Sequence, residues 1–215
     1  MRGVTQIRRQ RKRFVFKRKF TRYYVLCALF GVRKQVFITF ALWVLITVYN
    51  QPVDTIALLW VVVMLANLVT KPGIGWLIDR FGPRRILTVD ALCLVSVCLL
   101  YGYAEQLLSP TLALCTVALV YVADHVLFFA GSARAVYAGQ IADDSQEVAA
   151  TLSLGMTIDH VFSMSVPVLG GLIWKRFGYE YVFLAAAGVA LVTAFTAYGI
   201  SEQGGTPTAH TEGDA

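Results

Sequence analysis

The sequence predicts an all-α membrane protein built from six transmembrane helices. Of its 215 residues, 57% are hydrophobic and 15% are charged, whereas about a quarter of the residues in soluble domains are charged. The apolar residues gather into six blocks of roughly 20 residues, the length of a helix that crosses a bilayer. A soluble protein of this size could not bury so much apolar surface, so we expect a polytopic membrane protein.

Each span is bounded by polar or turn-forming residues. The run at 36–49 is too short to cross a bilayer alone, so the first span must include Arg33 and Lys34. Residues 50–55, 75–85, 105–110, 138–147 and 175–180 are expected turns or loops, and the stretch Asp143-Asp144-Ser145 offers an N-cap for the fifth span. The fourth span can run as one helix past Gly131. The expected spans cover about residues 23–49, 56–72, 86–104, 111–137, 148–174 and 181–200.

Charge predicts both the orientation and the flanking regions. Fifteen of the 19 lysines and arginines fall on the N-terminal side of the predicted spans, so both termini are expected in the cytoplasm. Residues 1–20 form a basic lead-in expected to lie on anionic lipid. Residues 21–200 form the bundle, and residues 201–215 a tail expected to be disordered. An RNA-binding lead-in is the alternative, but this charge placement favours membrane lipids over a nucleic-acid partner.

A short repeat suggests that the bundle contains two related halves. Residues 75–82 (GWLIDRFG) and 171–178 (GLIWKRFG) share a frame 96 positions apart. Each ends the second helix of a three-helix set, one turn on the cytoplasmic side and the other outside. The two sets are therefore expected to be inverted repeats.

The first of these turns carries a demanding motif. The pattern G-x-L-x-D-R-x-G-x-R-R resembles the signature loop of the major facilitator superfamily of transporters. Its matching residues are Gly75, Asp79, Arg80, Gly82, Arg84 and Arg85. The positive-inside rule alone explains the arginines, but not the aspartate or the two glycines. The resemblance implies that this set latches one conformational state and releases it during transport.

The resemblance covers about residues 14–200 and implies the C-terminal six-helix half of a bacterial member, in the inner membrane. A complete member has two such halves, so the expected partner is a missing N-terminal half or a second copy of this chain. A reading frame that is only a fragment is a further alternative. The basic lead-in then resembles the loop that joins the two halves.

Ionisable residues within the spans are the candidates for solute and proton binding, since each costs several kcal/mol unless paired. They are Arg33, Lys34, Asp124, His125, Asp159 and His160. At about 1.5 Å per residue, Arg33, Asp124 and Asp159 lie near one midplane. The Arg-Lys pair suits an anionic solute, and the Asp-His doublets suit proton coupling. Ion pairs that only hold the bundle together are the structural alternative.

These observations predict a secondary transporter module that moves a small solute by alternating access, with proton coupling. The alternative is a membrane scaffold that binds a partner and transports nothing. No nucleophile–base pair, phosphate loop or metal-ligand spacing is visible, so neither an enzyme nor a cofactor or metal site is expected. The substrate, the direction of transport and the coupling ion stay open.

Overall fold

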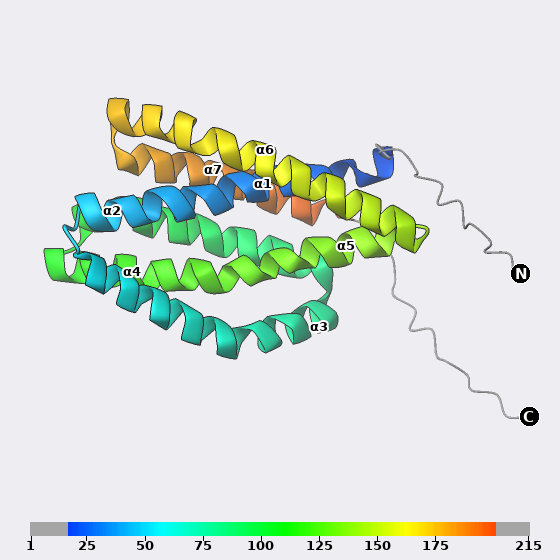
Figure 1. The fold of residues 1–215 in the computed structure, drawn as a ribbon, viewed down its shortest axis with the longest axis horizontal. Helices are drawn as coiled ribbons and strands as arrows, with labels where there is room; N and C mark the ends of the chain where they lie inside the picture. The colour runs from blue at the N-terminus through cyan, green and yellow to red at the C-terminus, as the bar shows by residue number, and fades with distance from the viewer. Residues whose placement is uncertain (1–16, 201–215) are drawn as a thin grey trace, which may run out of the picture.

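The computed structural model describes residues 17–200. Most of the expected lead-in and the whole expected tail lie outside the described residues. The described part of the chain is a bundle of long helices (Figure 1), so the all-α prediction is confirmed. The N- and C-terminal ends of this bundle lie at the same side, where the Arg22 guanidinium donates a hydrogen bond to the carbonyl of Gly199.

Ten helical elements follow one another within residues 17–200. In order they are η1 (Arg18–Phe20), α1 (Thr21–Val36), η2 (Phe37–Ala41), α2 (Leu42–Thr47), α3 (Val53–Leu107), α4 (Pro110–Leu127), η3 (Phe128–Ser132), α5 (Ala133–Ile141), α6 (Ser145–Phe177) and α7 (Tyr179–Tyr198). The elements from η1 to α2 form one continuous span, in which η2 is a π-helix. Likewise, α4, η3 and α5 form one span with a 3₁₀ segment inside it.

Helix α3 holds two of the six expected spans. It has 55 residues, which at 1.5 Å each would measure about 80 Å, against about 30 Å of bilayer hydrocarbon. Its two arms fold back on each other as a hairpin at Gly82 (Figure 1). Within residues 17–200, five helical rods are long and apolar enough to cross a membrane, and α3 counts among them once.

The expected loop at residues 75–85 is therefore wrong in its extent. The helix continues through Phe81, and only Gly82 leaves helical geometry, with φ 79° and ψ 159°. Glycine tolerates this positive φ at little cost, and Pro83 then suits the first turn of the next arm because it needs no N–H partner there. The chain thus reverses within a single residue, and the motif's polar side chains extend from a helix end.

The second copy of the repeat ends in the same way. Gly178 has φ 109° and ψ 166° and separates α6 from α7. The Gly82 and Gly178 bends lie at opposite ends of the bundle (Figure 1), which agrees with two three-helix sets that run in opposite directions.

Two apolar clusters fill the bundle, one towards each end. The cluster far from the termini centres on Phe37, Tyr101 and Phe183, with ring centroids 5.8, 5.8 and 4.7 Å apart. The Tyr101 hydroxyl donates to the carbonyl of Ala41, in the π-helix, at 2.7 Å. The cluster near the termini includes Phe20, Tyr23, Tyr24, Leu26, Cys27, Ile78, Leu87, Ala133 and Tyr137.

The beginning of α6 is fixed by the expected cap. The Asp144 side chain accepts a hydrogen bond from the Glu147 backbone N–H at 2.7 Å, which confirms it as the N-cap. The Glu147 carboxylate in turn accepts from Lys17 at 2.5 Å and from Lys19 at 2.8 Å. The start of the described chain is thereby tied to the start of α6.

Helices α1 and α6 approach each other very closely at Gly31. A Cβ added at Gly31 would overlap both the backbone carbonyl and the carboxylate of Asp159. Because a backbone atom of α6 lies in that position, a larger side chain has no room without separating the two helices. Only glycine fits this crossing.

We expect Gly31→Ala to destabilise the bundle by about 1–3 kcal/mol, because the added methyl overpacks the α1–α6 contact. Gly188→Ala in α7 is the matched control, since nothing lies within 4 Å of the Cβ it would add and alanine favours a helix by about 1 kcal/mol. Thermal unfolding of the detergent-purified chain measures both. Equal midpoints for the two variants would contradict the close approach.

Candidate functional site

A buried arginine joins three helices at the level between the two apolar clusters. Arg33 of α1 donates from Nη1 to Asp90 Oδ2 of α3 at 2.7 Å. It donates from Nη2 to Asp124 Oδ1 of α4 at 3.3 Å. The three residues are 6%, 6% and 4% exposed. Such charge-assisted bonds are roughly twice as strong as neutral ones, so this triad holds α1, α3 and α4 together.

The triad's formal charges do not balance. One guanidinium faces two carboxylates, which leaves one negative charge in excess when both are ionised. Asp90 Oδ1 and Arg33 Nε are also buried without a hydrogen-bond partner in the described protein. A buried charge without compensation is costly, so a single proton or a bound polar group would complete the triad.

His125 lies beside the triad. Its Nδ1 is 2.9 Å from the Tyr121 carbonyl oxygen, which can only accept, so this nitrogen is the donor. The ring packs against Trp60 of α3, with centroids 5.5 Å apart, and against Tyr121 at 4.3 Å. The imidazole is therefore oriented by α4 and by the first arm of α3.

The second ion pair joins α1 to α6. Lys34 Nζ lies 2.8 Å from Asp159 Oδ1, and both side chains are mostly buried. Ser163 Oγ lies 3.0 Å from the Gly31 carbonyl oxygen and 3.2 Å from the same carboxylate oxygen. Adjacent residues on a helix point about 100° apart, which is why Arg33 and Lys34 reach different partners.

His160 belongs to neither ion pair. This residue is exposed on α6, with Nδ1 2.7 Å from the Met156 carbonyl oxygen. It lines an open hollow of about 430 Å³ together with Lys34 and Gln35. Of the six predicted intramembrane residues, four form the ion pairs, and the two histidines lie outside them.

Two ionisable residues that the sequence analysis set aside belong to this region. Asp90 is buried because the second arm of α3 begins at Pro83 and not at residue 86, the predicted start of that span. Arg134 lies well inside its span because α5 continues to Ile141, beyond the predicted end at residue 137. At 1.5 Å per residue each lies about 10 Å from its helix end. Correct helix ends would have identified both residues as lying inside their spans.

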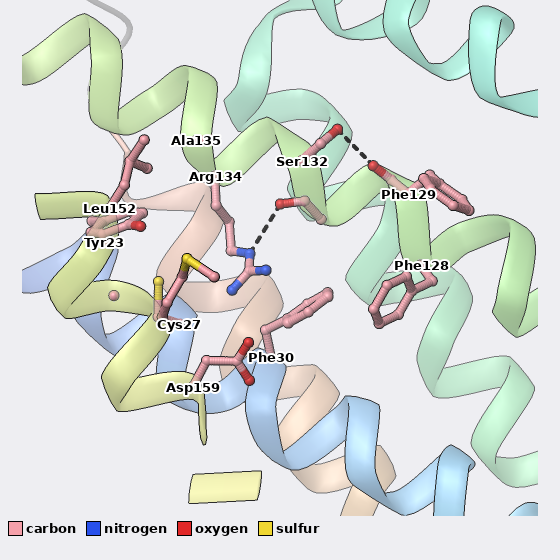
Figure 2. Close-up of a pocket in the computed structure, with 13 residues that line it drawn as sticks. Tyr23, Cys27, Phe30, Phe128, Phe129, Ser132, Arg134, Ala135, Leu152 and Asp159 are labelled. Carbon is pink, nitrogen blue, oxygen red and sulfur yellow. Dashed lines mark hydrogen bonds between the residues drawn. The ribbon is translucent and has the colours of Figure 1, made fainter. Parts of the chain in front are cut away.

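Arg134 lines a cavity of about 370 Å³ between α1, η3, α5 and α6 (Figure 2). Its Nε donates to the Gly131 carbonyl at 3.0 Å. Its guanidinium carbon is 3.5 Å from the centroid of the Phe30 ring, a cation–π contact. Asp159 lies on the facing wall. The full lining is Tyr23, Cys27, Phe30, Phe128, Phe129, Gly131, Ser132, Arg134, Ala135, Leu152, Gly155, Met156 and Asp159.

The signature residues form a separate group at the Gly82 bend. Arg80 lies over the Trp76 ring at 5.0 Å, and Arg84 lies over the Tyr198 ring of α7 at 4.8 Å. Gly75, Asp79 and Arg85 are exposed around them. Asp79 contacts no partner among residues 17–200. The bend is thus tied to α7 and not to the ion pairs.

Comparison with known proteins agrees with the resemblance found in the sequence. The family model described as Major Facilitator Superfamily matches residues 23–213. The chain is also similar to the multidrug resistance protein MdtG of Dickeya zeae (strain Ech586), with 31% identity over 132 residues. That match covers 61% of this chain and 30% of the relative, so the chain matches less than a third of that protein's length. No solved structure matches the chain significantly.

Arg33→Leu is expected to destabilise the detergent-purified chain by about 3–5 kcal/mol, because it leaves two buried carboxylates without their cation. Adding Asp90→Asn and Asp124→Asn should restore most of the loss by removing those charges. Arg176→Leu, at the exposed end of α6, is the control and should have little effect. An unchanged unfolding midpoint for Arg33→Leu alone would show that the triad does not stabilise the bundle.

Proposed function

Since this chain belongs to the Major Facilitator Superfamily, whose model covers residues 23–213, we propose that it forms one half of a secondary transporter. The chain is an integral membrane protein, and the proposed half moves a small solute by rocking against a partner half. The observation that carries the proposal is the buried ionic level at Arg33 and Lys34, which joins α1 to α3, α4 and α6.

Burying five charged groups within a membrane bundle is expensive, and such residues mark solute and ion pathways. An apolar core of the same shape would hold helices together as well or better. The ion pairs also lie between two separate apolar clusters, so a change at this level alters how four helices attach without unpacking either cluster. This favours a transport role over a purely structural one.

The charge excess of the triad supports proton coupling. A proton taken up by the Asp90–Asp124 pair balances the two carboxylates against Arg33, and releasing it restores the excess. Binding and release would thereby change how strongly α1 is held to α3 and α4. His125, next to Asp124 along α4, is a second candidate proton-binding side chain beside the triad.

The partner half in this proposal is a separate six-helix half or a second copy of the chain. Helix α6 and the first arm of α3 expose long apolar surfaces to a partner or to lipid. The exposed Asp79 and Arg80, at the Gly82 bend, would latch one state against that partner. Both termini are proposed to face the cytoplasm, in line with the basic residues on that side. The relative's name, a multidrug resistance protein, supports a small organic solute.

Asp124→Asn should abolish solute flux driven by a pH gradient, because the triad can no longer gain and lose a charge. Asp54→Asn, on the exposed first turn of α3, is the matched control and should transport normally. Uptake of 2-naphthoate and of ethidium is measured in liposomes. Two assemblies are tested: the chain alone, and the chain joined to the N-terminal half of the similar multidrug resistance protein.

Flux of either probe above that of protein-free vesicles supports a transporter, and its loss in Asp124→Asn supports proton coupling. If neither probe moves in either assembly, although both assemblies insert and stay monodisperse, the transport proposal fails and the scaffold alternative replaces it. Unchanged flux in Asp124→Asn would remove the triad from the coupling mechanism.

A further inference from the structure

The cations that the sequence assigns to an anionic solute are already occupied within the protein. Arg33 is bonded to two carboxylates, and Lys34 is bonded to Asp159. Arg134, by contrast, forms no ion pair with residues 17–200; its guanidinium contacts the Gly131 carbonyl, the Phe30 ring and the Cys27 side chain. Among the cations inside the spans, Arg134 therefore carries the uncompensated positive charge.

The cavity in front of Arg134 has the size and composition of a small-molecule site. Its 370 Å³ lies within the range of about 300–1,000 Å³ typical of ligand pockets. Figure 2 shows the guanidinium pointing into the cavity, with Phe30, Phe128 and Cys27 around it. Met156, at the rim, is 62% exposed, so the cavity opens on the α6 side of the bundle.

The charges on the cavity wall favour one negative ligand group. Asp159 faces Arg134 across the cavity (Figure 2), but Lys34 bonds the Asp159 carboxylate at 2.8 Å and neutralises it. The Arg134 Nε is used by Gly131, while the outer nitrogens of the guanidinium face the cavity. This fork matches the two oxygens of a carboxylate or sulfonate. Because the remaining wall is almost entirely apolar, a dianion such as phosphate would lose too much hydration.

The aromatic walls define the rest of the ligand. Phe30 and Phe128 pack with ring centroids 5.0 Å apart, and Phe129 and Tyr23 complete an aromatic surface around the cavity. Phe30 also packs directly on Gly131, where an added Cβ would overlap its ring. The ring beneath Arg134 is thus held in place by η3, so the aromatic surface and the charge have a fixed spacing.

From these features we infer that the cavity binds a small organic monoanion with an aromatic body, its carboxylate or sulfonate on Arg134 and its ring against Phe30 and Phe128. The inference rests on the proposed function and deepens it by naming the solute class. It places anion recognition on Arg134 in α5, across the cavity from the Lys34–Asp159 pair.

The test measures equilibrium binding to the full chain in lipid nanodiscs by calorimetry. The probe is 2-naphthoate, and 2-naphthamide is its neutral counterpart of the same shape. The chain is expected to bind the anion at least about tenfold more tightly than the amide, because the amide lacks a charge-assisted bond to Arg134. Arg134→Gln should remove this preference, and Arg134→Lys should keep part of it.

Two further variants separate the site from general effects. Arg176 also lies beside a phenylalanine ring, Phe177, at 5.7 Å, but does not line the cavity, so Arg176→Gln should bind naphthoate normally. Met156→Trp fills the cavity without changing its charge and should abolish binding. All variants must stay monodisperse. If Met156→Trp does not, Ser132→Trp replaces it, because this variant fills the cavity from the η3 side.

Equal binding of naphthoate and naphthamide, or naphthoate binding that survives both Arg134→Gln and Met156→Trp, overturns the inference. Its failure is distinct from that of the proposed function. Transport of ethidium with no naphthoate binding would reject the anion site and still support the transporter. Naphthoate binding that depends on Arg134, with no flux in either assembly, would keep the site and reject transport.

Discussion

The bundle depends on one guanidinium that must satisfy two carboxylates from two other helices. Arg33 bonds to Asp90 and Asp124 inside the bundle, where all three side chains are buried and bulk water does not solvate their charges. Such a group stabilises only while its partners stay in place, since a buried ion loses its hydration whether or not it is paired. The positions of α1, α3 and α4 are therefore set by charge at mid-depth and by apolar packing on either side.

The neighbouring group has the opposite imbalance. Around Arg33 the carboxylates outnumber the cations, whereas Asp159 has two cations near it: Lys34, which is bonded to it, and Arg134, which faces it across the cavity without forming an ion pair. Both groups attach to α1 through the consecutive residues Arg33 and Lys34, so under the proposed function one helix would link the proton-binding group to the anion-binding cavity. Movement of α1 would act on both, which gives a physical basis for coupling the two events without direct contact between them.

Much of this organisation is readable in the sequence, and the limits are specific. Apolar block length is enough to predict the helical spans, and the 100° between adjacent helical residues means that Arg33 and Lys34 cannot both face one cavity squarely. Asp90 and Arg134 were not predicted as candidate site residues because each lies near the expected end of its span. Pro83 and Ile141 extend α3 and α5 beyond their apolar runs, and hydropathy does not detect polar residues that remain helical. Which carboxylate meets which cation depends on helix rotation, which composition does not contain.

The crossing at Gly31 has a mechanical consequence. With no side chain between them, the backbones of α1 and α6 are in direct contact. The Lys34–Asp159 pair joins the same two helices beside this crossing, and Lys17, just before η1, pairs with Glu147 at the start of α6. Moving the two helices apart would therefore require breaking both the backbone contact and the Lys34–Asp159 pair. The rod formed by α4, η3 and α5 stands opposite, and its 3₁₀ segment at Phe128–Ser132 is the kind of irregular turn at which a helix can flex. The cavity thus lies between the closely packed α1–α6 pair and a span that is interrupted by a 3₁₀ segment.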